Sequence, residues 1–229
     1  MQNVTDRVRN PFGMRPPVVD GREAAVFGYG DANADVHVVG DYPGVHGGAG
    51  QRVGASDTAA PGDGTGVPFT ETLAGERLQG ALHEVGLLEA PYGDEPAVSN
   101  LFLSYLHMSV TEGGRRPTAD EYARLEPYFD AELRAIAAHV LVPVGERATR
   151  YVLEEYTSRA HAVESVAAAH ATEIRGRGFL VVPVGEPHDW AKGDRAALVE
   201  TLSAVLARDY RQISDLGRFE PGGDPYFVR

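Results

Sequence analysis

The chain has 229 residues, of which 43% are hydrophobic and 24% charged, the composition of one folded globular domain rather than a disordered chain. It has no cysteine, which excludes disulfides, a cysteine nucleophile and Cys-ligated zinc or iron–sulfur sites. No apolar run approaches the ~20 residues of a membrane span, and the polar N-terminus lacks the apolar segment of a secretory signal. We therefore expect a cytoplasmic protein with no membrane contact.

The charge balance is strongly acidic. Asp and Glu number 33 against 21 Lys and Arg, the formal net charge is −12, and Lys192 is the only lysine. This favours a halophilic protein, because at molar salt the Debye length is about 3 Å and an acidic surface repels itself little. A GC-rich genome, which favours arginine over lysine, is the alternative explanation. Charge alone disfavours a nucleic-acid partner, but less so at molar salt, where counterion release contributes little.

The first predicted segment, residues 1–33, is rich in Pro, Gly and Arg and is expected to lie on the domain as an arm. Four apolar, β-branched runs predict buried strands near residues 35–39, 98–103, 140–144 and 179–184. A Gly-rich stretch, residues 41–66, comes after the first strand and is expected to lack regular structure.

Helices are predicted between and after these strands. Thr118 and Glu121 form a capping-box pattern, and Pro127 is expected to split its region into two helices. The predicted helices cover residues 70–87, 119–125, 128–138, 146–155, 160–171 and 193–212, and the Gly/Pro-rich tail 213–229 is expected to be loosely held. Continuously apolar strands that alternate with helices predict an α/β fold, a doubly wound α/β/α sandwich with a central four-stranded parallel sheet. We expect it to form a single domain over residues 1–229.

Polar residues gather beyond the predicted strand ends, where ligands bind in such folds. They include Asp41 and Tyr42 after the first strand, Asn100, Ser104, Tyr105 and His107 within and after the second, Glu146 and Arg147 after the third, and Glu186, His188 and Trp190 after the fourth. His46, in the Gly-rich stretch, is also placed where it can approach this edge of the sheet.

Four segments, in this order, resemble the uracil-DNA glycosylase superfamily. They are residues 39–44 (VGDYPG), residues 65–70 (TGVPFT), residues 99–101 (SNL), and residues 116–118 (RPT) with Glu121, Pro127, Leu133, residues 140–145 and Ala148. The resemblance covers about residues 34–190. The fourth segment closely resembles the helix–strand–helix half of the iron–sulfur-bearing branch, but that branch has four cluster cysteines, so this chain resembles a cluster-free, haloarchaeal-type member.

Two departures from the family pattern bear on activity. The loop between the first motif and Phe69 is longer than in the family. The family's second catalytic motif is a strand followed by His-Pro-Ser, whereas this chain has Glu186, Pro187 and His188 there.

The resemblance implies roles for several residues. Phe69 offers a base an aromatic face, Asn100 reads the base edge with one donor and one acceptor, and Tyr42 is grouped with them as base-binding. Asp41 stabilises positive charge on the sugar and orients the attacking water. Each has an ordinary alternative: Phe69 as a core residue, Asn100 as a strand-end residue bonded to its own backbone, and Asp41 as a cap of the turn after its strand.

The loop after the fourth strand is implied to stabilise the leaving base and enter DNA. We expect the ring N–H of His188 to donate to the base anion, with Glu186 holding His188 or the loop. Trp190 is implied as a wedge, and Lys192 and Arg116 as phosphate contacts. The alternatives are an exposed loop residue for His188, packing on the last helix for Trp190, and a solvated turn for Arg116.

The function expected from this resemblance is a DNA glycosylase that excises uracil or a related deaminated base by hydrolysis of the N-glycosidic bond. It would act on DNA as a monomer, without cofactor or metal, since the histidines show no metal-ligand spacing. The departure at Glu186 keeps a second hypothesis open, a weak or inactive member that binds nucleobase or damaged DNA. A third is a hydrolase of free nucleosides on the same scaffold.

Overall fold

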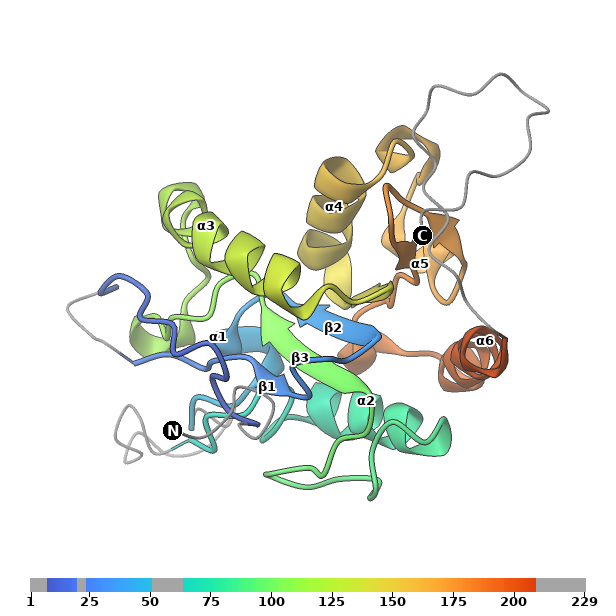
Figure 1. The fold of residues 1–229 in the computed structure, drawn as a ribbon, viewed down its shortest axis with the longest axis horizontal. Coiled ribbons are helices and arrows are strands. Elements are labelled where there is room, and N and C mark those ends of the chain that lie inside the picture. The colour runs from blue at the N-terminus through green and yellow to red at the C-terminus, as the bar shows by residue number, and fades with distance from the viewer. Residues whose placement is uncertain (1–7, 20–23, 51–63, 209–229) are drawn as a thin grey trace.

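The computed structural model describes residues 8–19, 24–50 and 64–208, so the predicted tail 213–229 lies outside the described residues (Figure 1). The strands are β1 (Tyr29–Gly30), β2 (Val36–Gly40), β3 (Leu101–Tyr105), β4 (Val140–Pro143), β5 (Ile174–Arg175) and β6 (Leu180–Val181). The α-helices are α1 (Pro43–His46), α2 (Leu73–Glu84), α3 (Ala119–Ile136), α4 (Gly145–Tyr156), α5 (Val166–Ala169) and α6 (Asp194–Ala207). The described residues also form the 3-10 turns η2 (Glu112–Gly114), η3 (Ala160–Ala162) and η4 (Pro187–Asp189).

The sheet has the predicted parallel centre. Its order is β1-β3-β2-β4-β6-β5, and β3, β2, β4 and β6 pair in parallel. Two short edge strands, β1 and β5, pair antiparallel with β3 and β6 and were not expected from the sequence. The doubly wound α/β fold is therefore confirmed, with six strands in place of four.

The central strands are buried on both faces because helices cover both faces of the sheet (Figure 1). On one side, α2 and α6 pack together and bury Leu78, Leu82, Leu198 and Leu202 in the larger core cluster. On the other side, α3 and α4 bury residues such as Phe129 and Val152 against the sheet.

Helix α3 corrects one prediction. Pro127 lies inside a continuous helix from Ala119 to Ile136, rather than splitting it. Proline removes one backbone donor, but Leu125 and Phe129, on either side of it, are both buried, so packing holds the two halves in line. The predicted capping box is confirmed, with the Thr118 hydroxyl and Glu121 carboxylate each accepting from the other's backbone N–H.

Other boundaries differ locally. The Gly-rich stretch contains α1, and the predicted helix 160–171 is two short turns, η3 and α5. In the described part of the N-terminal segment, Gly30 N–H donates to Val8 O and Val26 N–H donates to Met108 O, so this segment lies along the edge of the sheet. Among the helices described, none combines the length and apolarity needed to cross a bilayer.

Candidate active site

Asp41 lies directly after β2, at the carboxyl end of the parallel strands. Its side chain is half-buried, and the Tyr122 hydroxyl donates a hydrogen bond of 2.5 Å to its Oδ1. The guanidinium carbon of Arg147 lies 3.5 Å from the centroid of the Tyr122 ring. Burial raises the pKa of Asp41, while the Tyr122 hydrogen bond and the positive charges nearby counteract part of that rise.

His46, from α1, joins Asp41 to Glu186. The Asp41 backbone N–H donates to His46 Nδ1 at 3.0 Å, so in the neutral ring the proton is assigned to Nε2. Nε2 lies 3.2 Å from Glu186 Oε2, and the His46 side chain is fully buried. Gly145, at φ +84°, makes room for this pair, because a Cβ there would lie 2.9 Å from Glu186 Oε2. The other carboxylate oxygen, Oε1, is buried without a hydrogen-bond partner in the described residues.

An aromatic cluster lies behind this pair. The His46 ring centroid is 5.3 Å from that of Phe69 and 6.1 Å from that of Tyr105. The Tyr105 hydroxyl accepts from Phe69 N–H at 2.8 Å and donates to Gly47 O, which fixes the cluster. All three rings are fully buried, so in this structure the faces of Phe69 are covered by protein.

A cleft of about 780 Å³ opens beside the cluster, between α1, the start of α2 and the 186–188 loop. Its lining includes four acidic side chains, Glu71, Glu76, Asp94 and Glu186. His46 links the backbone of Asp41 to the carboxylate of Glu186, which lines the cleft, but Asp41 itself does not line it.

Glu71 has a second role at the rim of the cleft. Its carboxylate accepts from Gly50 N–H at 2.9 Å and from Thr65 N–H at 3.3 Å. It therefore ties together the two described ends of the Gly-rich stretch. Its backbone, at φ +64°, is held by a hydrogen bond from Glu71 N–H to the Tyr92 hydroxyl.

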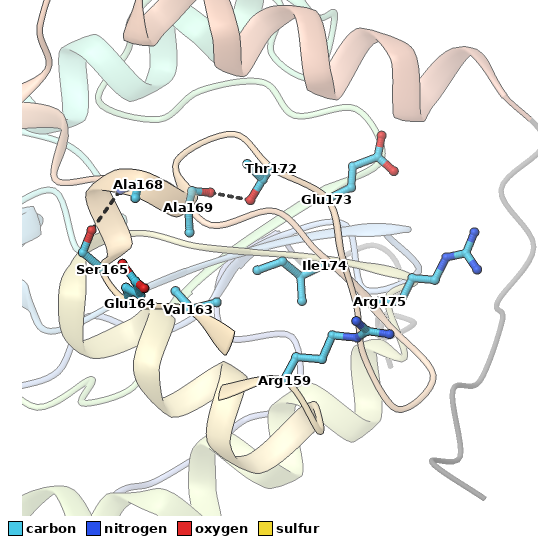
Figure 2. Close-up of a pocket in the computed structure, with 10 residues that line it drawn as sticks. All are labelled: Arg159, Val163, Glu164, Ser165, Ala168, Ala169, Thr172, Glu173, Ile174 and Arg175. Carbon is cyan, nitrogen blue, oxygen red and sulfur yellow. Dashed lines mark hydrogen bonds between the residues drawn. The ribbon is translucent and has the colours of Figure 1, made fainter. Parts of the chain in front are cut away.

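A second cavity, of about 670 Å³, lies between η3, α5 and β5 and contains none of the predicted site residues (Figure 2). Two arginines, Arg159 and Arg175, and two acids, Glu164 and Glu173, line it with small and apolar side chains. Glu173 is ion-paired with Arg208. The balance of charge gives this cavity no evident preference for an anionic ligand.

Asn100 does not share a site with Asp41, and the expectation that it lines one pocket with Asp41 and Phe69 is wrong. Leu101 pairs with Val36 at the start of the two strands, so Asn100 lies at their amino ends. Its side chain accepts from Asp35 N–H at 2.7 Å and donates to the Asp35 carboxylate at 3.1 Å. Asn100 therefore bonds to Asp35 rather than to its own backbone, and it lies before β3 because that strand begins at Leu101, three residues later than predicted.

Trp190 packs inward, which contradicts its predicted role as a wedge in DNA. Its indole N–H donates to Gly185 O at 2.9 Å, and its ring meets His170 edge-on at 5.8 Å between centroids. It also packs against the larger core cluster. His170 in turn contacts Asp194 O at the start of α6. Trp190 therefore holds the loop after β6 against the start of the last helix, α6.

Of the other predicted residues, Glu186 and His188 line the cleft. Arg77 donates to the carbonyls of Pro187 and His188 at 2.9 and 2.7 Å, which places the exposed His188 side chain along the cleft. Glu186 contacts His46, whereas the sequence suggested His188 as its partner. Tyr42 is half-buried beside Asp41, and Arg116 and Lys192 are exposed. Their roles toward base or DNA stay predictions.

Two residues central to this geometry were not identified as functional from the sequence. Tyr122 lies in a helix whose apolar spacing explains it as a core residue, so nothing marked it. His46 was noted only for its position in the Gly-rich stretch. The signal that could have found it is its place four residues after Tyr42 and three after Pro43, where a short helix turns its side chain back onto the strand end.

Metal and cluster sites find no support in this geometry. Residues 8–19, 24–50 and 64–208 contain no group of three or more His, Asp or Glu side chains arranged to hold a metal ion. A Cys-ligated iron–sulfur cluster does not fit, because the sequence offers no cysteine.

Comparison with known proteins identifies the family. The sequence profile of the uracil DNA glycosylase superfamily matches residues 27–205. The chain is also 28% identical over 184 residues to the Type-5 uracil-DNA glycosylase of Pyrobaculum aerophilum, an alignment that covers 79% of this chain and 73% of that protein. The chain belongs to the uracil DNA glycosylase superfamily.

Proposed function

We propose that this protein is a DNA glycosylase that removes uracil or a related deaminated base by hydrolysis of the N-glycosidic bond. The observation that carries the proposal is the half-buried Asp41 carboxylate at the carboxyl end of β2, fixed by Tyr122 and beside the His46–Glu186 pair. Family membership and the name of the Pyrobaculum relative support the same reaction class.

Asp41 supplies the electrostatic part of this reaction. As the C1′–N bond breaks, positive charge develops on the sugar and negative charge on the base. A carboxylate beside the sugar stabilises the first charge and orients a water whose oxygen forms the new bond to C1′. The water loses one proton, and the departing base takes one up, so the products are the free base and an abasic sugar.

The leaving base needs a donor, and His188 is the best placed. It lines the cleft from the same loop as Glu186, and its ring N–H can donate to the base carbonyl. The Glu186 carboxylate contacts His46 Nε2, so Glu186 positions the His46 ring and does not donate to the leaving base. The exposed Arg116 and Lys192 would contact backbone phosphates.

One observation favours the second candidate, a weak or inactive member that binds nucleobase or damaged DNA. Glu186 stands where the family resemblance leads us to expect a histidine, and its carboxylate contacts His46 Nε2 at 3.2 Å, so this position offers a departing base anion a carboxylate rather than a donor. In an inactive member, binding to DNA with uracil or an abasic site would persist without excision.

The test is base excision from oligonucleotides that contain one uracil, single- and double-stranded, in about 2 M KCl. We expect alkali-labile sites with the wild type and a loss of about 10²–10⁴-fold in rate with Asp41→Asn. Asp35→Asn is the matched control, since Asp35 precedes the same strand at its opposite end, and it should retain full activity.

Two results would contradict the proposal. If the wild type forms no alkali-labile site but binds the uracil-containing strand more tightly than an unmodified one, the binding function replaces the enzymatic one. If Asp35→Asn and Asp41→Asn lose equal activity, Asp41 has no special role.

A further inference from the structure

The hydrogen bond between Tyr122 and Asp41 joins a hydroxyl donor to a carboxyl acceptor. The Tyr122 hydroxyl donates to Asp41 Oδ1 at 2.5 Å. A hydroxyl donor binds an ionised carboxylate more strongly than a neutral carboxyl group, so this contact favours the charged form of Asp41 and engages one of its two oxygens.

Tyr122 is itself held from several directions. It is the fourth residue of α3, directly after the capping box, and Glu121 in that box accepts two hydrogen bonds from Arg115, at 2.7 and 2.9 Å. The guanidinium of Arg147 covers one face of the phenol ring at 3.5 Å, and His107 meets the ring edge-on with 5.4 Å between centroids. A side chain fixed in this way presents its hydroxyl to one point in space.

We propose that Tyr122 is a positioning residue of the active site, which fixes Oδ1 of Asp41, keeps this half-buried carboxylate ionised, and leaves Oδ2 to orient the attacking water. The inference rests on the proposed function for its effect on rate. Its structural part, the stabilisation of the Asp41 charge, stands without that function.

The groups around Asp41 act on its charge in opposite directions. Burial raises the pKa of Asp41, and the Tyr122 hydrogen bond is the largest influence that lowers it. The titratable and charged groups that face Asp41 are Tyr122 from α3, His46 from α1, Arg147 from α4, Arg116 from the segment before α3, and the adjacent Tyr42, with Glu186 behind His46. Without the Tyr122 hydroxyl, the effect of burial would be less opposed, and the pKa of Asp41 would rise further.

The experiment compares wild type with Tyr122→Phe, which keeps the ring under Arg147 and removes only the hydroxyl. The acid limb of kcat/KM against pH should move upward by about 1–2 pH units, the effect of one hydrogen bond to a charged group. Tyr128→Phe is the matched control, because Tyr128 lies on the same helix, is half-buried, and makes no hydrogen bond to the described part of the chain. Its acid limb should not move.

A second measurement separates this inference from the proposed function. Carbon-13 NMR of the Asp41 carboxyl group, assigned with Asp41→Asn, tracks its titration without any need for turnover. A higher titration midpoint in Tyr122→Phe than in wild type supports the inference even if the wild type proves inactive, in which case only the proposed function fails. An unchanged midpoint overturns the inference, and so does a uniform loss of rate at all pH values with no shift of the limb.

Discussion

Glu186 is the residue at which this chain departs most clearly from its family, and the structure gives that carboxylate a partner. Its Oε2 lies 3.2 Å from His46 Nε2, whose other nitrogen accepts from the Asp41 backbone. The Asp41 backbone N–H, the His46 ring and the Glu186 carboxylate therefore form one chain of polar contacts from the end of β2 to the loop after β6. In this arrangement Glu186 orients a buried imidazole while its own charge remains close to the place where a base anion would develop.

Replacement of that charge gives a prediction. Glu186→Gln keeps an oxygen that can accept from His46 but removes a negative charge that opposes the departing base anion. Excision should therefore become faster, by about tenfold or more for a unit charge several Å away at an effective dielectric constant of ~20. The measurement is the single-turnover rate on a uracil-containing oligonucleotide.

Glu146→Gln is the control for this variant. Glu146 is an exposed acid at the start of α4, paired with Arg150, and its loss should leave the rate unchanged. A slower Glu186→Gln enzyme would show instead that the charge itself is needed, for example to hold His46 against the rings behind it.

At the scale of single residues, the sequence could place only those residues that come directly after a predicted strand. Asp41 and Glu186 converge because each lies beyond the end of a parallel strand of the same sheet. Asn100 was misplaced because β3 begins at Leu101, three residues later than predicted, so Asn100 lies just before the strand rather than within it. His46 reaches the site from the four-residue helix α1, and Tyr122 reaches it from a face of α3 that has the apolar spacing of a core helix. Tertiary contacts of this kind produce no periodic pattern in the sequence.

Among the secondary-structure elements, β2, β3 and α3 share a buried polar cluster on the side of the sheet opposite to α2. His37 Nε2 lies 2.8 Å from the Ser104 hydroxyl, and Glu132 of α3 is buried beside them with no hydrogen-bond partner for its carboxyl oxygens in the described residues. Burial raises the pKa of Glu132 to about 8, with Ser104 acting in the opposite sense, and lowers the pKa of His37 to about 3. Both groups are therefore neutral in the folded protein near pH 6.

The cluster predicts an unusual dependence of stability on pH. Glu132 is protonated in the folded state up to about pH 8 but ionises in the unfolded chain near its ordinary pKa of 4.5. Its contribution to the free energy of unfolding is therefore present below pH 4.5 and is lost as pH rises to 8. Glu132→Gln should remove this loss and be more stable than wild type at pH 8 by a few kcal/mol, as measured by urea unfolding at about pH 5 and pH 8.

His37 provides the internal check. Because its pKa is lowered in the folded state, its contribution rises with pH from about 3 to its unfolded value and opposes that of Glu132 in the overlapping range. Glu132→Gln should thus expose a rise in stability up to about pH 6.5 that the wild type conceals. If the free energy of unfolding has the same pH dependence in wild type and Glu132→Gln, the ionisation of Glu132 does not destabilise the folded protein, and the prediction is wrong.

The elements themselves were largely predictable, for physical reasons that also explain the failures. The four central strands are buried on both faces and mostly apolar, so they stand out in the sequence as hydrophobic runs. The edge strands β1 and β5 have two residues each, which is too short for any pattern. Pro127 was given too much weight, because the buried Leu125 and Phe129 on either side of it outweigh one missing hydrogen bond.

The whole molecule carries a net charge of −12, and four of its acids converge on the proposed substrate cleft. A polyanion such as DNA would be repelled from that opening in dilute buffer. At about 2 M salt the Debye length falls below ~3 Å, so the repulsion acts only at contact. The acidic surface and a DNA substrate are therefore compatible in concentrated salt.

We accordingly predict that stability rises with KCl. Between about 0.1 and 2 M KCl the melting temperature should increase by about 4–8 °C, which corresponds to about 2 kcal/mol for a chain of this size. Scanning calorimetry in KCl and in NaCl at equal ionic strength would separate screening from specific binding of potassium. Equal melting temperatures at low and high salt would show that the acid excess is not an adaptation to salt.

The Glu71 carboxylate has a consequence for how this protein can vary. Because it accepts from both Gly50 N–H and Thr65 N–H, one carboxylate holds these two backbone positions together at the rim of the cleft. Both donors are backbone N–H groups, which every residue except proline carries. The side chains at positions 50 and 65 can therefore change without loss of these two hydrogen bonds, whereas a substitution that removes the Glu71 carboxylate breaks both at once.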